Sequence, residues 1–195
     1  MLTTGHSHQP LIEALLSEEN PKQMDITQIR QEINSLGLMI DNYYDSLTPH
    51  PDAASAINLG VQRLQVEIKT FLGSRENYVR SLHDSLQLYL LLLWPIEKPE
   101  HLSNRAEDLK HFLLQPHPRL CSSTKMLIWQ LSVGAVAAEP STELRSWYIE
   151  GLREVLTSRS DMGMEVTMWC LTQAFTPDSR LMTKFQATWH EVFNS

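Results

Sequence analysis

Few side chains in this sequence are spaced as catalytic or metal-binding groups would be. His6 and His8 are separated by one residue near the N-terminus, and His83 directly precedes Asp84. Two imidazoles do not fill a zinc site, because structural zinc takes four ligands. Adjacent residues on a helix do not face each other, so His83 and Asp84 are not expected to pair. Neither motif predicts a site.

A looser group lies around a Pro-x-Pro turn and contains His111, His117 and Cys121, whose closeness in sequence we attribute to chance. Cys121 and Cys170 are the two cysteines, and neither belongs to a C-x-x-C motif. Two buried free thiols are the favoured interpretation, although a disulfide stays open.

Known catalytic motifs are absent from the sequence. It has no nucleophile elbow, phosphate-binding loop, dinucleotide fingerprint or H-E-x-x-H motif. The aspartate-rich motifs of helical prenyl-diphosphate enzymes are missing as well. We therefore predict no enzyme, with no catalytic, cofactor-binding or metal-binding residues and no cofactor.

Composition and charge favour an all-α, intracellular protein. The 195 residues suit one domain, and only 7 are glycine. The net charge is -7, and the 16 Lys and Arg are scattered singly. Because DNA-binding surfaces are usually clustered and basic, we expect no direct nucleic acid contact. The N-terminus does not resemble a secretion signal, and the apolar run Leu86–Trp94 is too short for a membrane span.

Apolar spacing predicts about eight helices in a single helical domain. Residues 1–24 are expected to be a flexible leader, and residues 25–195 the domain. Within it, residues 25–72 are predicted to form an antiparallel helical hairpin packed on a C-terminal helical bundle of residues 76–195. The hairpin stripes follow heptad gaps, at Ile26, Ile29, Ile33, Leu36, Ile40, Tyr43 and Leu47 and at Ile57, Val61, Leu64, Ile68 and Phe71. Both stripes are expected to pack within the chain, the alternative being a dimeric coiled coil.

Turn and capping residues divide the rest of the chain. Asp52 is predicted to cap the second hairpin helix, and Leu86–Trp94 to be the central buried element. Ser141 is predicted to cap a later helix, and another begins at Asp161. Thr176 is predicted to cap the last helix, with proline at its first position.

The second half of the chain carries several short motifs in a particular order. They are Leu127-Ile128-Trp129, Val133-Gly134-Ala135-Val136-Ala137-Ala138, Arg145-Ser146-Trp147-Tyr148-Ile149, Leu152-Arg153, Glu165-Val166 and Trp189-His190-Glu191-Val192, preceded by Leu88-Tyr89-Leu90. Over about residues 80–195 the chain resembles the fungal-specific transcription factor domain, the helical regulatory region of fungal binuclear zinc-cluster regulators. Members usually carry a six-cysteine cluster that contacts DNA, and two cysteines rule that cluster out here. Where the family has a Phe-Leu-Trp run, this chain has Gln173-Ala174-Phe175.

The resemblance implies a helical regulatory module in the nucleus, with cytoplasm as the other expected location. It implies protein partners, including a full-length transcription factor, but neither a ligand nor an oligomeric state. The alternative is a stand-alone helical scaffold or interaction protein outside transcription.

The sequence also suggests where partners attach. Leu38, Met39 and Tyr44 lie beside the first hairpin stripe, and one stripe per helix is enough to close a hairpin. These three residues therefore either contact the body of the domain, which is the preferred interpretation, or form an interaction surface.

Overall fold

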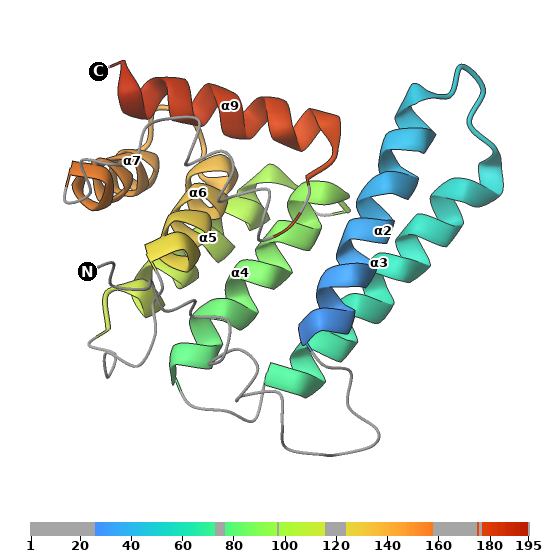
Figure 1. Ribbon diagram of the computed structural model, residues 1–195, viewed down its shortest axis with the longest axis horizontal. Helices are drawn as coiled ribbons and strands as arrows, with labels where there is room; N and C mark the ends of the chain where they lie inside the picture. Colours follow the sequence, from blue (N-terminus) through green and yellow to red (C-terminus); the bar gives the residue numbers. More distant parts are fainter. Residues whose placement is uncertain are drawn as a thin grey trace, which may run out of the picture.

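The computed structural model describes residues 26–72, 77–96, 98–115, 124–157, 175 and 177–194. These residues form helices and no strand, which confirms the all-α class. The helices are α2 (Ile26–Asp45), α3 (Pro51–Leu72), α4 (Asn77–Leu93), α5 (Pro99–Leu113), α6 (Thr124–Ala137), α7 (Glu143–Thr157) and α9 (Ser179–Phe193) (Figure 1). The predicted leader and the predicted helix from Asp161 lie outside the described residues.

Helices α2 and α3 run antiparallel beside each other (Figure 1). Their heptad stripes are buried within the chain, at Ile29, Ile33, Leu36 and Ile40 in α2 and at Ile57, Val61, Leu64 and Ile68 in α3. A Cβ on Gly60 would lie 3.2 Å from the Leu36 side chain, so the two helices approach closely there. Glu32 and Arg63 form an ion pair across them. The apolar stripes are therefore covered without a second chain.

Two predictions at the hairpin turn are wrong. Leu47 is fully exposed because α2 ends at Asp45, before this last stripe position. Asp52 does not cap α3, because the helix already begins at Pro51 and Asp52 is its second residue. The backbone N–H of Asp52 donates to Nδ1 of His50 at 3.3 Å. The carbonyl of His50 accepts from the N–H of Ala53, and α3 begins at Pro51, where a missing N–H removes no helix bond.

Helix α4 is the central element of the fold and contacts α3, α5 and α6. The run from Leu86 to Trp94 is buried throughout, as its composition predicts. Both ends of this run bond to α3. Gln87 donates to the carbonyl of Gln65 at 2.8 Å, and the Trp94 indole N–H donates to Oδ1 of Asn58 at 2.5 Å. These polar contacts fix how α4 lies along α3.

Helix α6 is covered on nearly every side and packs most extensively on α7. Their contact centres on Gly134, where an added Cβ would overlap the ring of Tyr148. The Tyr148 hydroxyl donates to the carbonyl of Ala106 in α5 at 2.7 Å. Burial, followed by the carboxylate of Glu107, raises the pKa of Tyr148 far above its ordinary value, so the phenol remains a donor.

The N-caps of α7 and α9 differ from the predicted ones. Thr142, and not Ser141, accepts the N–H of Arg145 at 3.3 Å, because Ser141 has a positive φ of 63° and forms the turn before the helix. In α9 the cap is Asp178 and not Thr176, since Oδ1 of Asp178 accepts the N–H of Leu181 at 3.2 Å. The fully buried carboxylate of Asp178 also pairs with Arg180 at 2.8 Å, an ion pair that a threonine could not form.

Gly134→Ala is expected to destabilise the domain by about 1–3 kcal/mol, the usual cost of overpacking a core. The added methyl group would overlap Tyr148, which is held between α6 and the backbone of α5. Chemical denaturation followed by circular dichroism measures the change.

Gly151→Ala is the matched control, because its Cβ would meet only the Leu131 side chain, at 3.4 Å or more. Replacing a helical glycine whose new methyl group makes only ordinary van der Waals contact gains up to about 1 kcal/mol of helix propensity. Equal effects at Gly134 and Gly151 would contradict the close α6–α7 contact.

Candidate functional site

The three predicted surface residues are partly or largely exposed but do not form one surface. Leu38 is 64% exposed, Met39 44% and Tyr44 46%. Leu36 faces α3, and each residue turns about 100° around the helix axis. Relative to Leu36, Leu38 points about 160° away, whereas Met39 and Tyr44 lie about 60° and 80° away on opposite sides. The structure therefore does not bring Leu38, Met39 and Tyr44 together.

Tyr44 contacts the body of the domain. The guanidinium carbon of Arg180 lies 3.7 Å from the centre of the Tyr44 ring, and the ring of Trp94 lies 5.9 Å away. Next to this contact, Oδ1 of Asp41 accepts the backbone N–H of Ser179 at 2.8 Å. Arg180 also donates to the carbonyl of Leu93 at 2.8 Å. Tyr44 thus helps hold the hairpin to the start of α9.

The side of α3 opposite its buried stripe carries two apolar residues that were not predicted. Leu59 is 68% exposed and Val66 64% exposed. They are seven residues apart, so they lie on the same side of the helix. The seven-residue spacing of Leu59 and Val66 is visible in the sequence, but the longer heptad stripe of α3 was the one used for the prediction. We call this stripe of Leu59 and Val66 the outer face of α3.

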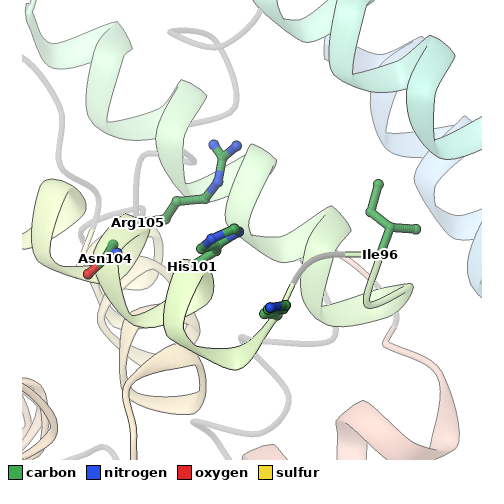
Figure 2. A pocket seen from close by; sticks show the side chains of 5 residues that line it. Ile96, His101, Asn104 and Arg105 are labelled. Carbon is green, nitrogen blue, oxygen red and sulfur yellow. The ribbon is translucent and has the colours of Figure 1, made fainter.

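A shallow surface pocket lies at the connection from α4 to α5. It has a volume of about 550 Å³ and is lined by Ile96, Lys98, His101, Asn104 and Arg105. Figure 2 shows His101, Asn104 and Arg105 on α5, with Ile96 on the preceding connection. Lys98 is the N-cap residue of α5 but makes no side-chain cap bond. The lining combines basic and polar side chains with the apolar Ile96, and it contains no carboxylate.

Side chains that could do chemistry are not gathered elsewhere in the described part of the chain. The expectation for His83 and Asp84 is wrong, because Nδ1 of His83 lies 2.8 Å from Oδ1 of Asp84 in a partly buried pair. His111 lies 3.8 Å from Glu107. No three His, Cys, Asp or Glu side chains among the described residues are placed to hold a metal ion. His6, His8, His117, Cys121 and Cys170 lie outside those residues.

None of the helices in the described part of the chain is both long enough and apolar enough to cross a membrane.

Residues of the family-like motifs hold helices together. Nη1 of Arg145 donates to the carbonyl of Ala135 in α6 at 2.6 Å, and Nη2 donates to Glu191 in α9 at 2.7 Å. Arg153 bonds the carbonyls of Glu191 and Val192 at the end of α9. These two arginines of α7 thus link α6, α7 and α9, and their side chains are used in the fold.

The aromatic residues of these motifs lie mostly in the core. The rings of Tyr89, Trp129 and Phe175 pack together, with centres 5.0 to 5.7 Å apart. Burial, followed by the charge of Asp178, raises the pKa of Tyr89 well above its ordinary value. Trp189 is also fully buried, whereas Trp147 is only half-buried and has Lys110 5.6 Å above its ring. These contacts are those of a core and form no ligand cage.

Comparison with known proteins returns no match to a protein family, to a curated protein or to a solved structure. The resemblance to the fungal transcription factor domain therefore remains a prediction from the residues quoted above.

Tyr44→Ala is expected to lower the free energy of unfolding by about 1–2 kcal/mol, because it removes one cation–π contact and its aromatic packing. Thermal unfolding followed by circular dichroism measures this loss as a fall of several degrees in Tm. Leu38→Ala, on the same helix, should change the free energy by less than about 0.5 kcal/mol, as is usual for exposed sites. Equal losses in the two variants would show that Tyr44 does not support the hairpin.

Proposed function

We propose that this chain is a helical regulatory domain that works by associating with other proteins, including transcription factors, and that it does not itself contact DNA. In this proposal the hairpin of residues 25–72 is a module packed on the bundle of residues 76–195, and the protein acts in the nucleus. The observation that carries the proposal is that residues of the family-like motifs hold the helices together. Arg145, Gly134 and Tyr148 make contacts between helices, so the function falls to other residues, on the surface of the domain.

The charge distribution supports the part of the proposal that concerns DNA. A net charge of -7 repels phosphates, and several described basic side chains are already paired with carboxylates. Arg63 pairs with Glu32, Arg145 with Glu191 and Arg180 with Asp178. A domain that contacts several phosphates needs such cations to be available.

Purified protein is expected not to bind DNA with submicromolar affinity at physiological salt. Fluorescence anisotropy with labelled duplexes measures this, and the salt dependence separates weak electrostatic attachment from specific binding. Specific binding that persists at physiological salt would contradict the proposal.

A tethering experiment tests the regulatory part of the proposal. Fused to an unrelated DNA-binding domain, the chain should change the output of a reporter gene several-fold, because it would bring its partners to the promoter. The unfused chain should leave the reporter unchanged. The folded Gly151→Ala variant should change reporter output as much as the parent does, and a destabilised Gly134→Ala variant should change it less.

Tethering and co-purification together decide between the two functions. No change in reporter output by a well-expressed, folded fusion would contradict a role in transcription. Co-purification with cytoplasmic proteins alone would then favour the scaffold function outside transcription.

A further inference from the structure

The outer face of α3 is arranged as one half of a symmetric helix contact. Leu59 and Val66 are both about two-thirds exposed, one heptad apart and opposite the buried stripe. Gln62 and Arg63 lie between them, and Arg63 is drawn towards α2 by its ion pair with Glu32. The apolar surface between the two side chains is thus flanked by an uncharged residue and by a charge that is already neutralised.

Apart from Arg63 and Glu67, which pair with each other, charge along α3 is ordered about this stripe. Asp52 lies in the first turn and Lys69 in the last turn, and both are exposed. The acidic end precedes Leu59 by seven residues, and the basic end follows Val66 by three. Two copies of such a helix placed antiparallel match apolar residues at the centre and opposite charges towards the ends. Parallel copies would instead bring like charges together.

We propose that the outer face of α3 docks against the same face of a second copy of this chain, antiparallel and about a two-fold axis. Such an interface is isologous, because the same patch is used by both copies. The proposal goes beyond the regulatory function above, which specifies no oligomeric state.

The two-fold relation fixes which residues meet. With the axis between Gln62 and Arg63, Leu59 lies opposite Val66 of the second copy, and Val66 lies opposite Leu59. Lys69 of the second copy then lies opposite Ala56, about one helical turn from Asp52, within reach of the long lysine side chain. Each copy therefore contributes Leu59 and Val66 to the apolar contact. It also contributes Asp52 to one charge pair and Lys69 to the other.

The apolar contact is small, so the association is expected to be weak. Interfaces that bury less than about 1,200 Å² belong to transient complexes. We expect a dissociation constant of about 10 µM to 1 mM, which corresponds to about 4–7 kcal/mol. The dimer should therefore form only at high protein concentration.

Sedimentation equilibrium of the purified chain over a concentration series tests the proposal. The parent should show a reversible monomer–dimer equilibrium, and Leu59→Glu and Val66→Glu should each weaken it at least tenfold. Leu114→Glu, an exposed leucine at the end of α5, is the matched control and should leave it unchanged. A parent that is monomeric at every concentration, or a dimer that resists both substitutions, would overturn the proposal.

A charge exchange tests the antiparallel orientation. Asp52→Lys should weaken dimerisation, because it places two lysines near each other at each end of the contact. Adding Lys69→Glu should restore dimerisation to near the parent value. If the two charges serve only the helix dipole, the double variant will instead be worse than the single one, since both changes oppose the dipole.

Circular dichroism checks that every variant remains folded. If a glutamate variant has lost helix, the charge exchange alone decides the proposal. Failure of the dimer proposal can be told apart from failure of the proposed regulatory function. Sedimentation is measured on the purified chain without any other protein, and the tethering experiment does not require a dimer.

Discussion

The rest of the fold depends on the burial of α4. A helix whose second half is mostly leucine is stable in water only if other helices surround it, since each buried leucine contributes about 1.5–3 kcal/mol. Helices α3, α5 and α6 supply that cover, since each of them contacts α4. The hairpin is part of this requirement, because α3 contacts both α2 and α4.

Close packing fixes the positions of the helices α5, α6, α7 and α9 relative to one another. Helix α6 approaches α7 through Gly134, and Tyr148 passes on to the backbone of α5, so one side chain sets the spacing of three helices. Arg145 does the same for α6, α7 and α9 with charged hydrogen bonds. A layer held in this way offers rigid surfaces, which suits a domain that presents a fixed shape to partners.

Much of this architecture could be predicted from the sequence, because apolar periodicity reports directly on which side of a helix is buried. The two heptad stripes were predicted for that reason, and the buried run at Leu86 was predicted because it is apolar on all sides. Helix ends were predicted less well, since Asp52, Ser141 and Thr176 are all good capping residues and the sequence does not show which candidate adopts the geometry. Tertiary contacts decided these cases, most clearly at Asp178, whose carboxylate is needed by Arg180.

The candidate surface was harder to predict, because exposure depends on neighbours far away in the sequence. Leu38, Met39 and Tyr44 are close in the chain, yet they point in different directions around α2. The positions of Arg180 and Trp94 show that Tyr44 contacts the body of the domain. Leu59 and Val66 could be assigned to the surface only once the buried stripe of α3 was known.

The bond between Asp41 and the N–H of Ser179 also bears on the order in which the protein folds. It joins positions 138 residues apart in the sequence, so it can form only after the chain has been synthesised as far as Ser179. The hairpin depends on local contacts, which form quickly, whereas closure of such a long loop is slow. A nascent chain would therefore carry a finished hairpin whose Trp94-facing edge remains uncovered until α9 arrives.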